Sequence, residues 1–123
     1  MNQSAQRYNA EFLKYKAMNI ISEIAANEAD IVGWRRELHA HPELAYEEHQ
    51  TADFVAERLT EWGLEVHRGL ATTGVVGTLS SGKGPSVGLR ADMDALPIHE
   101  ENDFDYRSQN DGKMHACGHD GHT

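Results

Sequence analysis

The sequence predicts an α/β fold in which helical segments come first and short strands follow. Three observations support this prediction. Apolar residues recur at helical spacing across residues 18–63, apolar and polar residues alternate across residues 64–80, and acidic residues follow an apolar stretch that begins at residue 86. Because α/β folds place ligands at the carboxyl ends of strands, we expect functional residues after about residue 91.

The first helical segment covers residues 18–40. Its apolar residues recur at helical spacing: Ile20, Ile24, Ile31 and Leu38. Pro42 ends the pattern, because the residue before a proline avoids the α region. Gly33 weakens the middle by about 1 kcal/mol relative to alanine. One helix with a loose centre and two short helices both fit this pattern.

The second helical segment covers residues 46–63 and is more regular. One apolar stripe runs along it: Ala52, Val55, Leu59 and Trp62. Glu47 and Glu48 suit the positive end of the helix dipole at the N-terminus. Gly63 is placed to cap the C-terminus, where a left-handed residue is common.

The strands are predicted from alternation and turn residues. Residues 64–69 and 74–80 each have the pattern of a strand, and residues 82–85 form the turn after the second. A third strand is expected to begin at residue 86 and to become a loop at about Ala91. We also expect a short edge strand at 104–107. A sheet built only from these strands would expose an unpaired edge and an apolar face.

The composition predicts a folded, acidic protein. Hydrophobic residues make up 39% of the chain, and a net charge of −9 argues against nonspecific binding to nucleic acid or to an anionic membrane. A single cysteine cannot form an internal disulfide, so we expect a reducing, cytoplasmic setting. Residues 1–17 are polar and lack a signal-peptide core, and we expect them to be an extension, with Met18 as an alternative start.

The stretch "MHACGHDGHT" (114–123) concentrates metal-binding residue types. Cys117 and His119 are two residues apart, and thiolate and imidazole are the usual ligands of zinc and similar ions. The other polar residues of the stretch are His115, Asp120 and His122. The spacing does not match a four-ligand structural zinc site. A histidine-rich surface loop with an inert cysteine therefore fits the local pattern equally well.

Two further groups of polar residues precede this stretch. Asp92 and Asp94 would face the same side of a strand, where they could bind a metal or accept the ring N–H of a metal-bound histidine. On their own they fit solvated acids at a strand end. His39 and His41 lie at a helix end before Pro42, and we assign them to structure.

Four segments occur in one order: "WRRELHAHPELAYEEHQTADFV", "TTGVVGTL", "GLRADMDALPI" and "GKMHACGHDGHT". Together they resemble the start of the metal-dependent amidohydrolases of the zinc-peptidase-like superfamily. Members include hippurate hydrolases, N-acyl-amino-acid deacylases, N-acetyl-diaminopimelate deacetylases and auxin-conjugate hydrolases. The resemblance implies that residues 18–123 are the N-terminal portion of a mixed-sheet metal-binding domain, incomplete here, in an enzyme that dimerises through a second domain.

The resemblance also implies site residues. Cys117 and His119 would be ligands of a two-metal site that holds zinc, manganese, nickel or cobalt, and the cysteine could bridge the ions. Asp94 would orient the site as a supporting acid. Asp92 lies where related peptidases have a metal-binding histidine. The remaining motif residues would be supporting groups: His115, Asp120 and His122.

The expected reaction is hydrolysis of the amide bond of a small N-acyl amino acid by a metal-activated water. In the family, the general-base glutamate and further metal ligands lie downstream of the Cys/His motif. We therefore expect this chain to be an inactive N-terminal fragment of a homodimeric enzyme, without nucleic-acid or membrane partners. The alternatives are a small non-catalytic metal-binding module and a remnant that pairs with larger subunits.

Overall fold

The computed structural model describes residues 21–123, and the chain divides into two compact units, Met1–Ile31 and Val32–Thr123. The expected extension at residues 1–17 and the alternative start at Met18 lie outside the described residues. Within the described part of the chain, no helix is both long and apolar enough to cross a membrane.

The first helical segment is divided into two helices, α2 (Ser22–Ala26) and α3 (Glu28–Ala40). The division falls at Asn27 and not at Gly33. The Asn27 side chain donates a hydrogen bond of 2.7 Å to the Glu23 carbonyl, and its backbone N–H bonds to the Ile24 carbonyl. Asparagine competes for helix backbone groups in this way, which explains why the first helix ends there.

Helix α4 (His49–Glu61) ends as the sequence predicts. Gly63 has φ +80°, its N–H bonds to the Thr60 carbonyl, and the Leu64 N–H bonds to the Leu59 carbonyl. These two bonds form a Schellman motif, in which a left-handed glycine satisfies the last carbonyls of the helix.

The start of α4 is stabilised by a residue that the sequence analysis did not single out. The Glu43 carboxylate accepts hydrogen bonds from the backbone N–H of Gln50, at 3.1 Å, and of Thr51, at 2.8 Å. A carboxylate at this end satisfies free N–H groups and complements the helix dipole. Glu48, expected to serve the dipole, is instead buried and accepts a hydrogen bond from the Thr73 hydroxyl.

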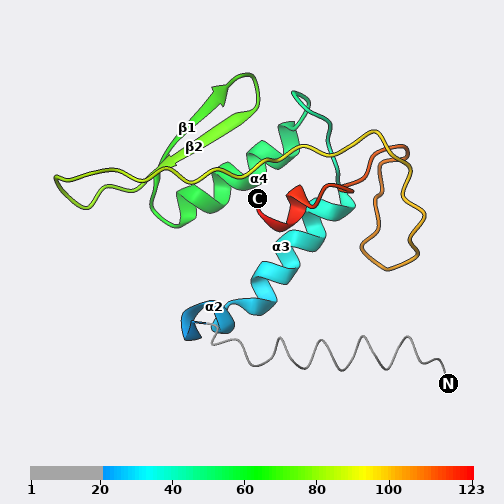
Figure 1. Ribbon diagram of the computed structural model, residues 1–123, viewed down its shortest axis with the longest axis horizontal. Helices are drawn as coiled ribbons and strands as arrows, with labels where there is room; N and C mark the ends of the chain where they lie inside the picture. The colour runs from blue at the N-terminus through cyan, green and yellow to red at the C-terminus, as the bar shows by residue number, and fades with distance from the viewer. Residues whose placement is uncertain (1–20) are drawn as a thin grey trace. The chain divides into compact units, whose positions relative to one another are not determined.

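The first two predicted strands form an antiparallel hairpin, β1 (Glu65–Leu70) and β2 (Gly74–Thr78), with Glu65 opposite Thr78. Helix α4 runs beside this hairpin (Figure 1). At Gly77 a Cβ atom would lie 2.9 Å from the Leu64 side chain, so the glycine permits close packing of the hairpin against its neighbours.

The prediction of a third strand from residue 86 is wrong for the described residues. The segment after β2 is extended but belongs to no ladder, and Figure 1 draws it as a plain trace (yellow). Val87 and Leu89 are 86% and 96% exposed. A strand is stabilised by hydrogen bonds to a neighbour, and the described part of the chain supplies none here. Outside the hairpin, the described residues form only isolated β-bridges, which pair Leu44 with Ala95 and Leu96 with Met114.

The edge strand predicted at 104–107 is also absent from the structure. This segment forms a turn in which the Phe104 and Tyr106 rings stack at 4.2 Å between centroids. Both rings also lie against His39, at 5.6 and 5.7 Å. The aromatic residues that favour a strand by propensity therefore pack as a small cluster over a buried histidine.

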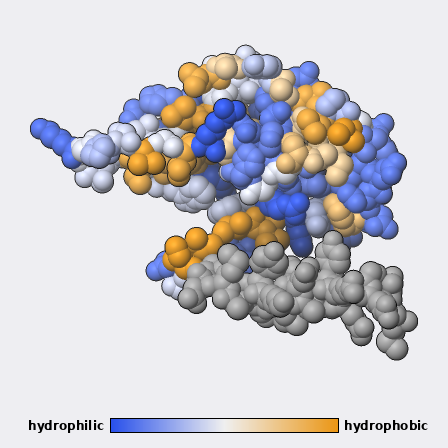
Figure 2. Space-filling view, viewed as in Figure 1, coloured by the Kyte–Doolittle hydropathy of each residue, from blue (hydrophilic) through white to orange (hydrophobic). Residues whose placement is uncertain are grey.

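The buried interior of the described residues is small and unusually polar. Its apolar members are Leu38, Ala40, Pro42, Ala52, Ala56 and Ala95. Its polar members are His39, Glu43, Glu48, Thr51, Thr73, Glu100, His115 and Asp120. The surface in Figure 2 correspondingly shows apolar residues (orange) interspersed with hydrophilic ones. Contacts between polar side chains therefore contribute much of the order around the candidate site.

Candidate metal centre

The C-terminal motif folds as a short 3-10 turn, η1 (His119–Gly121), after a left-handed residue. Gly118 has φ +86°, a conformation that costs a residue with a Cβ about 1–2 kcal/mol. The turn is closed by hydrogen bonds from the Gly121 N–H to the Gly118 carbonyl and from the Thr123 N–H to the His119 carbonyl. The motif glycine therefore sets the direction of the histidine that follows it.

His119 is oriented by the loop that contains Asp94. Its Nδ1 lies 3.0 Å from the Asp94 carboxylate and 2.9 Å from the Asp94 carbonyl. Both are acceptors, so Nδ1 carries a hydrogen, and in the neutral form of the ring Nε2 has the free lone pair. A histidine that donates one ring N–H to a carboxylate while its other nitrogen is free has the arrangement of a metal ligand with its supporting acid.

Cys117 lies at the same loop. Its exposed thiol is 3.8 Å from the Asp94 carbonyl, so Cys117 and His119 approach the same backbone group. The two residues that the sequence pattern singled out thus lie close together. Thiolate and imidazole side by side suit zinc and related first-row ions.

Asp92 and His122 also lie beside His119. One possible ligand atom from each of the three residues falls within 4.8 Å of the others. The backbone N–H of Asp92 donates a 3.3 Å hydrogen bond to His122 Nδ1, and the His119 and His122 rings meet edge to face at 5.0 Å. A hydrogen bond from Arg90 lowers the pKa of Asp92, so this carboxylate is an anion at neutral pH.

Asp120 points away from these side chains and into the interior. Its carboxylate lies 2.7 Å from His39 Nδ1 and 3.1 Å from Arg35. His39 Nε2 lies 3.0 Å from Glu100, so the ring is held between two carboxylates. Each ring nitrogen of His39 thus faces one buried carboxylate oxygen at hydrogen-bonding distance. This network joins the end of α3 to the turn that contains His119.

From the sequence, His39 and His41 were expected to have structural roles, and the buried position of His39 agrees with this expectation. The His41 side chain lies 3.0 Å from the Glu37 carbonyl of its own helix. The partnership of His39 with Glu100 and Asp120 was not predicted. These residues are 61 and 81 positions from His39 in the chain. No local pattern carries that information, and only the folded chain brings them together.

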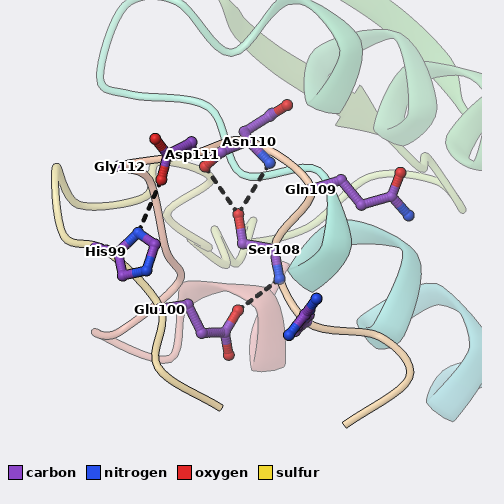
Figure 3. Close-up of a pocket in the computed structure, with 8 residues that line it drawn as sticks. His99, Glu100, Ser108, Gln109, Asn110, Asp111 and Gly112 are labelled. Atoms are coloured by element: carbon purple, nitrogen blue, oxygen red, sulfur yellow. Dashed lines mark hydrogen bonds and ion pairs between the residues drawn. The ribbon is translucent and has the colours of Figure 1, made fainter. Parts of the chain in front are cut away.

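The Glu100 carboxylate accepts several hydrogen bonds, and it also lines a pocket that is separate from the candidate metal ligands. Burial acts to raise its pKa, but hydrogen bonds from Asn102, His39 and the Ser108 N–H outweigh burial and lower the pKa overall. The pocket has a volume of about 360 Å³ and a polar lining that includes His99, Glu100 and Asn110. Figure 3 shows Glu100 and Ser108 joined at its wall. None of the candidate metal ligands lines it.

His115 is buried, with 4% of its surface exposed. Its two ring nitrogens have no hydrogen-bond partner in the described part of the chain, and burial lowers its pKa. Its ring lies 6.4 Å from that of His39. His115 therefore packs as a neutral ring next to the His39 network.

The donor set fits a divalent metal ion. Two imidazoles and an ionised carboxylate have possible ligand atoms within 4.8 Å of one another, Asp94 orients the His119 ring, and the Cys117 thiol approaches the same Asp94 carbonyl. Zinc, manganese, cobalt and nickel all accept such donors.

This chain is similar to known proteins in sequence and in fold. Residues 88–123 match peptidase family M20/M25/M40. An N-acyl-L-amino acid amidohydrolase of Geobacillus stearothermophilus is 48% identical over 111 residues, which are 89% of this chain and 29% of that protein. A hippurate hydrolase of Campylobacter jejuni is 47% identical over 107 residues, which are 86% of this chain and 28% of that protein.

A solved structure extends the similarity to three dimensions. The Bacillus subtilis protein described as a dinuclear metal-binding peptidase of the M20 family matches with a TM-score of 0.72 and 39% identity. The match covers 78% of this chain and 27% of that one. The chain thus spans less than a third of the length of the relatives that it matches.

These similarities confirm the resemblance read from the four sequence motifs and the α/β fold class. The sequence identities are 39–48% across most of the chain, so the similarity is one of sequence as well as of fold. By sequence and by structure, these residues match the N-terminal part of the metal-dependent amidohydrolases and peptidases of family M20/M25/M40.

Proposed function

We propose that the whole protein hydrolyses the amide bond of N-acyl amino acids at a centre of divalent metal ions. The observation that carries this proposal is the placement of His119, whose Nδ1 is held by Asp94 next to the Cys117 thiol. The relatives named as an N-acyl-L-amino acid amidohydrolase and a hippurate hydrolase support the substrate class. Because the chain spans 29% of the first relative, the proposal concerns the whole protein, whatever its length.

The residues described here would hold and orient the metal. Cys117 and His119 are the proposed ligands, and Asp94 fixes the His119 ring by accepting its N–H. When bound, divalent ions lower the pKa of a water molecule and polarise the carbonyl of the substrate. Asp120, held by His39 and Arg35, fixes the backbone of the turn next to His119.

We do not assign the general base to Glu100, the buried glutamate of this region. Glu100 accepts hydrogen bonds from His39, Asn102 and the Ser108 N–H, which leaves it no role in proton transfer. We propose that the base and the remaining ligands come from the part of the protein that corresponds to the rest of its relatives. On this proposal the 123 residues alone hydrolyse no substrate at a useful rate.

The proposal extends to the setting of the protein. Cys117 must stay a reduced thiol to serve as a ligand, so we place the protein in the cytoplasm, where thiols are kept reduced. Two ions per site are proposed from the relative described as dinuclear, and a homodimer from the family resemblance. The substrate is a small molecule, and the acidic net charge of −9 does not favour nucleic acid.

The test is hydrolysis of N-acetyl amino acids and hippurate by the protein isolated from its native cells. Activity should disappear with a chelator and return with zinc, manganese, cobalt or nickel. The Cys117→Ser and His119→Ala variants should lose activity, while His67→Ala, which alters an exposed histidine of β1, should match the wild type. Activity that survives chelation would contradict the proposal. Tight metal binding without hydrolysis would favour the alternative of a metal-binding module.

A further inference from the structure

Three side chains near the C-terminus form a second, thiol-free set of metal ligands. We propose that Asp92, His119 and His122 together bind one divalent cation, and that this site does not use Cys117. Two imidazoles and one carboxylate are a recognised donor set for first-row ions. The inference rests on the proposed metal centre only through His119, which the two ligand sets share.

The distances allow all three residues to reach one ion. Ligand atoms bound to a single zinc-like ion at about 2.1 Å lie at most about 4.2 Å apart. The three possible ligand atoms already lie within 4.8 Å of one another. The remaining difference is small, and His122 is exposed, so its side chain can rotate without disturbing the interior.

The backbone holds the two halves of the site together. Thr123 Oγ1 lies 2.8 Å from the Asp92 carbonyl and 2.7 Å from the His119 carbonyl, and its single hydrogen is shared between these two acceptors. Asp94 fixes the His119 ring from the same loop that carries Asp92. Residues 92–94 and 119–123 therefore stay in contact by bonds that do not involve the ligand atoms of Asp92 or the Cys117 thiol.

The lone pairs needed for a cation are available. His122 Nδ1 accepts the Asp92 N–H at 3.3 Å, a long hydrogen bond that a metal ion can replace. The Asp92 carboxylate is paired with Arg90, whose side chain is 86% exposed. An exposed ion pair contributes little, so Arg90 competes only weakly with a divalent ion for this carboxylate.

Cobalt(II) is the probe, because a thiolate ligand produces a near-ultraviolet charge-transfer band that imidazole and carboxylate ligands do not. The 123-residue chain is titrated with Co²⁺ under reducing conditions, and visible and near-ultraviolet absorption are recorded. Cys117→Ser should keep a Co²⁺ site without the thiolate band. His122→Ala and Asp92→Asn should each weaken that site by about 10-fold or more, because even an outer-shell change costs about 10–100-fold in affinity.

Two further variants sharpen the test. Arg90→Gln should strengthen binding a few fold, because it removes the cation that competes for Asp92. His67→Ala is the matched control, since it alters an exposed histidine of the hairpin next to a carboxylate, Glu65. Circular dichroism of each variant checks that the fold is kept.

The outcomes separate this inference from the proposed function. If His122→Ala and Asp92→Asn bind Co²⁺ like the wild type while Cys117→Ser abolishes binding, the inference is overturned and the Cys117–His119 centre stands. Absence of Co²⁺ binding by every form of the chain would also overturn the inference. If a thiol-free site is found but hydrolysis by the native protein resists chelation, the inference stands and the proposed function fails.

Discussion

Two neighbouring segments of this chain, residues 92–123 and residues 79–91, differ in what holds them. The first contains almost no regular secondary structure, yet Glu100 and Asp120 have side chains only 2% exposed. The second includes the strand predicted from residue 86, but Leu89 in that stretch is 96% exposed. The segment without regular secondary structure therefore contains buried side chains, while the segment with a strand-like sequence is exposed.

The contrast shows that a loop is ordered by partners and not by its own pattern. In residues 92–123 each buried acid meets a donor on another element, and His39 joins two of them. Buried polar groups that are fully paired specify one arrangement, because any other would leave a charge without a partner. In residues 79–91 the apolar side chains and backbone groups have no such partner in the described part of the chain.

The largest expected effect is the loss of order in residues 92–123 when the central histidine is removed. His39→Ala should lower the free energy of unfolding by about 3–5 kcal/mol, because it removes the side chain that joins the buried carboxylates of Glu100 and Asp120 and leaves each of them short of a partner. Urea denaturation followed by circular dichroism measures the change. His41→Ala, at a more exposed histidine two residues away, is the control, and an equal loss in both variants would refute the role of His39.

A smaller effect is expected at the turn before His119. Gly118→Ala places a Cβ on a residue with φ +86° and should cost about 1–2 kcal/mol in the free energy of unfolding. Gly121→Ala is the matched control, because its φ is not positive and a Cβ there would meet no atom within 4 Å. Thermal melts of the pair compare the two. Equal melting temperatures would mean that the left-handed residue does not set this turn.

The pH dependence of stability should report on Glu100. Its pKa is lower in the folded chain than the ordinary value of 4.5, so the folded state favours the anion. The resulting stabilisation is present above pH 4.5 and is lost as the pH falls through the folded pKa. Urea denaturation across this acidic range should give a flatter curve for Glu100→Gln than for the wild type. The exposed neighbour Glu101 provides the control, and Glu101→Gln should leave the curve unchanged.

The smallest effect is expected in residues 79–91. Leu89→Lys should change the free energy of unfolding by less than about 0.5 kcal/mol, because the side chain makes no buried contact in the described structure. Leu38→Ala, in the buried interior, is the comparison and should cost about 2–5 kcal/mol. Chemical denaturation of both variants measures the two changes in the free energy of unfolding. A large loss on Leu89→Lys would show that this segment packs against a partner in solution.

Features that depend on neighbouring residues could be predicted from the sequence. Gly63 caps α4, the alternation of residues 64–80 becomes the hairpin, and the motif around Cys117 and His119 places both beside Asp94. The spacing of apolar residues and the backbone preference of glycine determine the helix cap and the hairpin within a few residues. The order of the four sequence motifs indicates the family, and with it the roles of Cys117 and His119.

Contacts between residues far apart in the sequence became known from the folded chain alone. It placed Glu43 at the start of α4, His39 between Glu100 and Asp120, and Asp92 beside His122. It also left residues 86–91 without a strand partner. The physical reason is the same in each case. A carboxylate, an imidazole or a strand edge is stabilised by the group opposite it, and that group lies elsewhere in the sequence, where no local pattern can indicate it.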